Sequence, residues 1–230
     1  MSEQSAFNQK VVAEQAYSET SGLLDQLNLP PGAIRFIRGN KKAIQIAAAV
    51  VILLIVVGSL YKSYRTKRFE NAASGLAMAL ETEGDVRTKN LQQVADDFSG
   101  TPSALWATVE LGHQAMKGSL YTEAIKYYSQ VLEKVSSSNP MYSLVTYGLA
   151  QANEAAKNYE AAEATYSGLK DTEGYKDLGY KGMARVLEAQ GNNDKALAVY
   201  EEYLGTFLGE APDEENKKTI IEKITRLRVK

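Results

Sequence analysis

Few residues of this sequence have the side-chain chemistry that catalysis requires. The 230 residues include one histidine, His113, and no cysteine, so disulfides and thiol nucleophiles are excluded. The chain contains no Gly-rich phosphate loop, no dinucleotide-binding fingerprint and no set of residues with metal-ligand spacing. Its many carboxylates are spread over expected helix faces, where Asp and Glu are normally solvated. We therefore expect a protein that is not an enzyme and that binds neither a cofactor nor a metal ion.

A different group of residues could bind a peptide. In three expected helices, residues three and four apart fall on a face rotated by about 130° from the face that should pack on a partner helix. Most of the first residues in each set are apolar and most of the last are polar, which suits an extended or helical peptide. The sets are Trp106, Val109, His113 and Met116; Leu144, Tyr147, Gln151 and Glu154; and Leu178, Lys181, Arg185 and Glu188. The alternative is that Trp106 and Leu144 simply pack on the preceding helix.

The expected helices belong to an internal repeat. Segments 111–132, 149–170 and 183–204 align with one another at offsets of 38 and 34 residues. In each segment two small residues stand twelve positions apart with a turn signal between them, and a tyrosine follows four positions after the second. A helix–turn–helix unit with a period of 34 residues is typical of tetratricopeptide repeats. The sequence therefore predicts an all-α fold in which helical hairpins stack into a superhelix.

The small residues have a packing role in this interpretation. Two antiparallel helices approach closely where both carry small side chains, and a tyrosine would then fill the gap toward the next hairpin. The predicted packing residues are Gly112 with Ala124, Ala150 with Ala162, and Ala184 with Ala196, and the tyrosines are Tyr128, Tyr166 and Tyr200. We expect residues 212–230 to close the stack as a capping helix. Its apolar face would consist of Ile220, Ile221, Ile224 and Leu227.

The stretch Ala43–Leu60 has the length and composition of a membrane span. Its eighteen residues carry no charge, and eleven of them are Ile, Leu or Val. As a helix it would measure roughly 27 Å, close to the ~30 Å hydrocarbon core of a bilayer. A signal peptide would begin nearer residue 1 and end in small residues, and a soluble core helix is rarely apolar all round. The stretch therefore predicts a permanent single-pass anchor.

These patterns divide the chain into four parts. We expect an N-terminal tail over residues 1–40, a transmembrane helix over 41–61, a helical stalk with the first hairpin over 62–102, and three repeats with the capping helix over 103–230. The stalk would continue the membrane helix to about residue 83, because apolar residues recur on one helical face. The residues of that face are Phe69, Ala73, Leu76 and Leu80.

The charges exclude one class of partner and leave the orientation open. Residues 69–230 contain 17 basic and 24 acidic residues, and an acidic domain without a basic stripe is not expected to bind nucleic acid. Four basic residues precede the span closely and four follow it. The excess of positive charge that marks the cytoplasmic side of membrane proteins therefore favours neither orientation.

The layout, together with the phrase VADDFSGTPSALWATVELG at residues 94–112, resembles the bacterial tetratricopeptide-like inner-membrane proteins, which include the ancillary subunit of the SecYEG translocon. The resemblance covers roughly residues 40–230. It implies a cytoplasmic N-terminal tail and a periplasmic repeat domain beside the translocon and a membrane-anchored chaperone of the prolyl-isomerase type. Tetratricopeptide domains that grip chaperone C-termini use a Lys/Asn clamp. Val109 and His113 occupy the first two places of that clamp here, so we do not expect it.

The function expected from residues and resemblance together is that of a scaffold in the bacterial inner membrane. Its partners would be proteins, namely translocon subunits and envelope chaperones. Two alternatives remain open. The repeats could face the cytosol as a receptor or assembly factor, or they could serve cell division or outer-membrane assembly from the periplasm.

Overall fold

The computed structural model describes residues 29–209 and 214–229, and every regular element within these ranges is a helix. The helices are α3 (Pro31–Gly39), α4 (Lys41–Leu80), α5 (Gly84–Asp97), α6 (Pro102–Lys117), α7 (Tyr121–Leu132), α8 (Met141–Ala155), α9 (Tyr159–Leu169), α10 (Lys176–Ala189), α11 (Asn193–Gly205), the 3-10 helix η1 (Thr206–Gly209) and α12 (Glu214–Arg228). The chain forms two compact units, an N-terminal unit that ends at Tyr64 and a repeat unit that begins at Arg65. The prediction of an all-α helical repeat is confirmed for the described residues.

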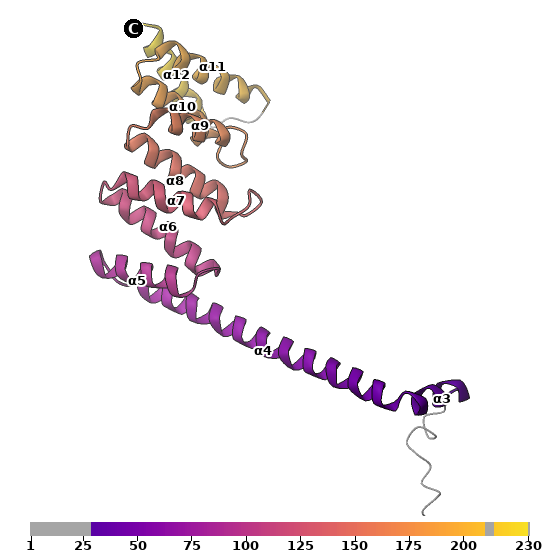
Figure 1. The fold of residues 1–230 in the computed structure, drawn as a ribbon. Helices are drawn as coiled ribbons and strands as arrows, with labels where there is room; N and C mark the ends of the chain where they lie inside the picture. The colour runs from indigo at the N-terminus through magenta and orange to yellow at the C-terminus, as the bar shows by residue number, and fades with distance from the viewer. Residues whose placement is uncertain (1–28, 210–213, 230) are drawn as a thin grey trace, which may run out of the picture. The chain divides into compact units, whose positions relative to one another are not determined.

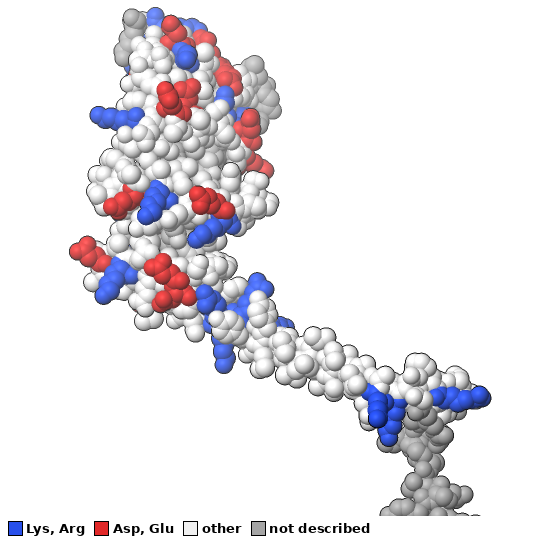
Figure 2. All heavy atoms as spheres, viewed as in Figure 1, with Lys and Arg blue, Asp and Glu red and all other residues white. Residues whose placement is uncertain are grey.

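The N-terminal unit contains α3 and the first part of α4. Helix α4 is long and apolar enough to cross a membrane. Its most apolar stretch is 0% buried, whereas the core helix of a soluble domain would be mostly buried. In Figure 2 this stretch is white, and blue lysine and arginine side chains flank it at both ends. Helix α4 therefore has the features of a helix that could anchor the chain in a membrane.

The repeat unit begins with the last part of α4, which packs against α5. Ala72 and Ala79 are buried, and Ala79 lies in one apolar cluster with side chains of α5 and α6. A Cβ atom at Gly75 would lie 3.2 Å from Cγ2 of Val94, so the two helices approach closely there. Arg68 donates hydrogen bonds of 3.1 and 3.2 Å to two carbonyl oxygens at and just after the C-terminal end of α5. Small side chains and one arginine thus join the two helices.

The predicted apolar face of this part of α4 is wrong at two positions. Ala73 and Leu80 are exposed, because the buried face of α4 is shifted by one residue, to Ala72 and Ala79. The helix also ends at Leu80, three residues earlier than expected. The chain then turns through Gly84, whose φ of +57° lies in the left-handed region that favours glycine.

The following helices form a stack of hairpins within the repeat unit (Figure 1). The hairpins are α6 with α7, α8 with α9 and α10 with α11, and each helix contacts the next one along the chain. The first helices of successive hairpins also contact one another, α6 with α8 and α8 with α10. At the start of the stack, the hydroxyl of Thr101 accepts a hydrogen bond from the Ala104 N–H and caps α6. The sequence period therefore corresponds to one hairpin.

The turn inside each hairpin contains one residue in the left-handed region, at the same phase of the repeat. These residues are Ser119 (φ 59°), Lys157 (φ 63°) and Gly191 (φ 78°). The conformation costs a residue with a Cβ atom roughly 1–2 kcal/mol, and glycine avoids that penalty. The first two turns therefore carry strain that the third turn does not.

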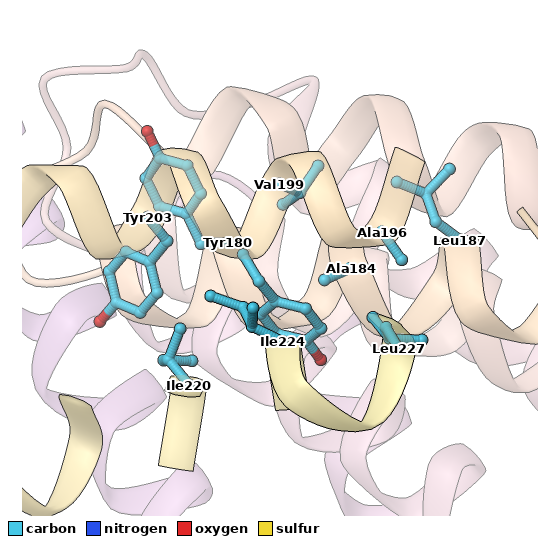
Figure 3. Packing of buried hydrophobic residues seen from close by; sticks show 10 residues of the cluster. Tyr180, Ala184, Leu187, Ala196, Val199, Tyr203, Ile220, Ile224 and Leu227 are labelled. Atoms are coloured by element: carbon cyan, nitrogen blue, oxygen red, sulfur yellow. The ribbon is translucent and has the colours of Figure 1, made fainter. Parts of the chain in front are cut away.

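The C-terminal end of the stack is closed by α12 (Figure 3). Ile220, Ile224 and Leu227 are buried in one cluster with α10 and α11 side chains, among them Tyr180 and Tyr203. The prediction that Ile221 shares this face is wrong, because Ile221 is 44% exposed. The buried positions are four and three residues apart, and a neighbouring position in a helix turns about 100° away from them.

Candidate protein-binding surface

The six predicted packing residues are all buried in the repeat unit. Ala150 and Ala162 belong to one apolar cluster. Ala184 and Ala196 belong to the next cluster, which Figure 3 shows. A side chain at Gly112 would collide with the neighbouring helix, because a Cβ atom there would lie 2.6 Å from Cε1 of a tyrosine in α7. The small residues thus lie where helices of one hairpin come together.

Two further glycines receive the repeat tyrosines, and sequence reasoning missed them. Tyr128 of α7 is buried against Gly148 of the next hairpin, where a Cβ atom would lie 2.9 Å from Cζ of the ring. Tyr166 of α9 is buried in the same way against Gly182 of α10. Each glycine stands two positions before a predicted packing alanine, and that repeated Gly-x-Ala spacing was the available signal.

The hydroxyl of Tyr166 takes part in a polar clamp between two hairpins. It donates a 2.7 Å hydrogen bond to Oε2 of Glu154 in α8. Arg185 of α10 donates through Nε to Oε1 of Glu154, and its Nη2 atom lies 2.7 Å from Oε2. Burial alone would raise the pKa of Glu154, but the hydrogen bonds from Arg185 and Tyr166 outweigh it and hold that pKa below its ordinary value. Burial and the bond to Glu154 raise the pKa of Tyr166. The clamp therefore holds an ionised glutamate beside a neutral tyrosine.

The same arrangement recurs at the end of the stack. Tyr200 of α11 donates a 3.0 Å hydrogen bond to Oε1 of Glu188, which stands 34 residues after Glu154. Arg226 of the capping helix α12 donates to the other oxygen of Glu188. Burial, followed by the hydrogen bond to Glu188, raises the pKa of Tyr200. One clamp thus joins the second and third hairpins, and the other joins the third hairpin to α12.

The interface between the first and second hairpins has different residues at the repeat positions that carry the glutamate and the arginine of the clamps. Met116 stands where the other hairpins have the glutamate, and Gln151 stands where α10 has Arg185. The His113 ring lies edge-on to the ring of Tyr128, with centroids 5.9 Å apart. Burial and the negative charge of Glu110 raise the pKa of Tyr128 to about 12. Val145 and Ala152 of α8 lie in the apolar cluster of Tyr128, so apolar and aromatic contacts join these two hairpins.

The predicted groove residues lie on α6, α8 and α10, and we call the surface that they form the inner face. Its polar members mostly bind other residues of the chain. Besides the Arg185 clamp, Lys181 pairs with Asp177 at 2.9 Å, and Gln151 donates a 3.0 Å hydrogen bond to the hydroxyl of Tyr147. The charged edge expected for the groove is thus occupied by contacts within the fold.

The apolar members of the inner face differ in exposure. Trp106 is 41% exposed, and the apolar groove residues of the other hairpins, Leu144, Tyr147 and Leu178, are half-buried. Val109, in contrast, is 0% exposed and lies in the apolar cluster of Tyr128, so its placement in the groove is wrong. Helix α6 contacts α5, α7 and α8, and a helix enclosed on three sides buries more of its circumference than a two-helix argument predicts.

Three cavities of the repeat unit lie away from the inner face. One of about 610 Å³ lies beside the α9–α10 loop and the end of α11, one of about 580 Å³ lies between α11 and α12, and one of about 230 Å³ lies between α4 and α5. None of them is lined by a predicted groove residue. Within residues 29–209 and 214–229, no group of three His, Asp or Glu side chains is placed to hold a metal ion.

Comparison with known proteins connects this architecture to a family. The family model of the tetratricopeptide repeat-like domain matches residues 35–225. A crystal structure of nearly identical TPR-like repeats, from a proposed kinesin light chain of Podosopora anserina, is 18% identical and superposes with a TM-score of 0.52, covering 73% of this chain and 86% of the other. A single-substitution variant of those repeats gives the same values. No curated protein matches the sequence. The chain belongs to the tetratricopeptide repeat-like domain family.

Proposed function

We propose that the chain is a membrane-anchored scaffold whose inner face binds proteins. The observation that carries the proposal is the exposed indole of Trp106, the only tryptophan of the chain, on a surface whose charged groups pair with one another. Tryptophan and tyrosine are the residues that most often supply binding energy at protein interfaces. Membership of a repeat family that binds proteins agrees with this role.

The contacts of the inner face favour an apolar partner segment. Arg185 and Lys181 are paired with Glu154 and Asp177, so binding an acidic peptide would first have to break these pairs. A partner that contacts Trp106, Leu144 and Tyr147 does not have to break an ion pair. A helical or extended segment with apolar side chains at regular spacing would therefore fit better than a chain with an acidic C-terminus.

The proposed location is the periplasmic side of a bacterial inner membrane, next to the Sec translocon and a membrane-anchored chaperone of the prolyl-isomerase type. Support comes from the apolar helix α4 and from the resemblance carried by residues 94–112. In this role the inner face would hold a chaperone or an emerging chain near the translocon. A cytosol-facing receptor and a periplasmic assembly scaffold differ from it in sidedness and in partner.

A crosslinking experiment tests the proposed surface. A photoreactive residue at Tyr147 or Lys181 of the full chain, which leaves Trp106 in place, should capture translocon subunits or an envelope chaperone in intact membranes. The matched control is Ala164, an exposed position on α9, which should capture far less. Recovery of only cytosolic proteins would contradict the proposed location, and equal capture from Ala164 would contradict the inner face as the binding surface.

Sidedness can be measured independently because the chain has no cysteine. Ser137→Cys places one thiol on an exposed position between α7 and α8. A maleimide that cannot cross the inner membrane should label it in cells whose outer membrane alone has been opened. Labelling only after the inner membrane is broken would place the repeats in the cytosol.

A further inference from the structure

Helix α3 has an apolar face and a basic face. Ile34, Phe36 and Ile37 fall on one side of the helix at about 100° per residue, and Arg35 falls on the opposite side. Phe36 is 64% exposed and Ile37 is half-buried. A short helix with a bulky apolar side chain exposed to water and a basic opposite face is the pattern of helices that lie in a membrane interface.

The charges around α3 all have one sign. From residue 26 to residue 69 the chain contains no Asp or Glu, and the first acidic residue after this stretch is Glu70. Arg35, Arg38, Lys41 and Lys42 lie within eight residues of one another and directly before the apolar stretch of α4. Anionic phospholipid headgroups complement such a cluster.

A break in the backbone separates α3 from α4. Asn40 has φ −113° and ψ 24°, outside the helical region. Its side-chain amide and its backbone N–H both donate to the carbonyl oxygen of Phe36, each at 3.0 Å, and this caps the end of α3. Helix α4 begins at the next residue, Lys41. The cap therefore ends α3 before α4 begins, so the two are separate helices.

We infer that α3 is a membrane-interface helix that binds anionic phospholipids. Its apolar face enters the boundary between headgroups and acyl chains, and Arg35 contacts the phosphates together with Lys41 and Lys42. The inference rests on the membrane anchoring proposed for α4, because the apolar stretch of α4 brings α3 to the bilayer. It adds a lipid-binding surface to a chain whose repeat unit binds proteins.

Site-directed spin labelling of the full chain in vesicles tests the inference. Ala33→Cys places a label on the apolar face of α3, Gly39→Cys places one near the basic face, and Leu54→Cys places one inside the apolar stretch of α4. A Cβ atom at Gly39 meets no atom within 4 Å, so that substitution has room. In vesicles of phosphatidylcholine with phosphatidylglycerol, the label at Ala33 should be more accessible to oxygen and less accessible to a water-soluble nickel chelate than the label at Gly39.

Charge removal tests the lipid specificity. Each basic residue near an anionic surface favours binding by about fivefold, so Arg35→Gln with Arg38→Gln should lower the ratio of bound to free α3 by about 25-fold. The matched control, Lys62→Gln with Lys67→Gln, removes the same charge beyond the other end of the apolar stretch and should leave the α3 labels unchanged. Vesicles of phosphatidylcholine alone should reproduce the effect of removing the arginines.

The labels separate this inference from the anchoring itself. Equal nickel accessibility at Ala33 and Gly39, with Leu54 protected, would leave the anchor intact and refute the interface helix. The same protection of Ala33 with and without phosphatidylglycerol would refute the role of anionic lipid. A nickel-accessible label at Leu54 would refute the membrane anchor, and the interface helix with it.

Discussion

Adding one methyl group at Gly182 should destabilise the repeat unit, although alanine is the better helix former. A Cβ atom there would overlap the ring of Tyr166, which is fully buried and donates to Glu154. Overpacking a well-packed core costs about 1–3 kcal/mol, and moving the hydroxyl from its acceptor costs about 1 kcal/mol more. The gain in helix propensity is about 1 kcal/mol. We therefore expect a net loss of about 1–3 kcal/mol for Gly182→Ala.

A second glycine provides the matched control. Gly168 lies in α9, is exposed, and a Cβ atom there would meet nothing within 4 Å. Gly168→Ala should stabilise the unit by about 0.5–1 kcal/mol, because only the helix propensity changes. The two substitutions are chemically identical and should have effects of opposite sign.

Urea unfolding of residues 65–230, followed by circular dichroism, measures both changes. Leucine is smaller than tyrosine, so Gly182→Ala should lower the unfolding free energy less in a Tyr166→Leu background than in the parent. The double variant should therefore be more stable than the sum of the two single effects predicts. If Gly182→Ala unfolds at the same urea concentration as the parent, Tyr166 is not wedged against α10. The proposed tyrosine contact between hairpins would then be refuted.

Five other substitutions, in three sets, test separate parts of the structure. The pKa of Glu154 lies below its ordinary value of 4.5, so its ionised carboxylate stabilises the fold above pH 4.5, and this stability is lost as the pH falls through the folded pKa. Glu154→Gln should therefore be less stable than the parent at neutral pH and should lose less stability on acidification, as urea midpoints at several pH values would show. An unchanged pH dependence would contradict the hydrogen bonds from Arg185 and Tyr166 to Glu154. Ser119→Gly and Lys157→Gly should each raise the unfolding free energy by about 0.5–1 kcal/mol in the same urea assay, because both residues have positive φ. A loss of stability would mean that their side chains make contacts that outweigh the backbone strain. Trp106→Ala should weaken partner capture while changing the unfolding free energy by at most about 1 kcal/mol. Val109→Ala should lower the unfolding free energy by about 1–3 kcal/mol, because it leaves a cavity in the core. The reverse pattern would place Trp106 in the core and Val109 on the binding surface.

The repeat phase was predictable because it depends on residues close together in the chain. Gly112 and Ala124 are twelve residues apart, within one hairpin, and the close approach of its two helices requires small side chains at both positions. The same pair recurs twice, so the sequence shows where each hairpin lies. The apolar stretch of α4 was recognisable for a similar reason, since length and composition are sufficient to identify a candidate span.

The candidate binding surface was predicted less well because burial depends on neighbours in other hairpins. A two-helix argument placed Val109 on the groove, but α6 also packs on α5 and α8, and Val109 is enclosed. Arg185 was expected to face a partner, yet it reaches Glu154, 31 residues earlier in the chain. No local pattern contains that pairing.

By itself, the sequence determined the helical hairpins, their period and the apolar stretch of α4, because each follows from spacing and composition over a few turns of helix. Only the tertiary structure decided which face of α4 contacts α5, which glycines receive Tyr128 and Tyr166, and which charges are satisfied within the fold. These features depend on the rotation and depth at which one hairpin packs on the next. That packing geometry results from many contacts acting together. It is the packing of the hairpins that leaves the charged groups paired and Trp106 exposed.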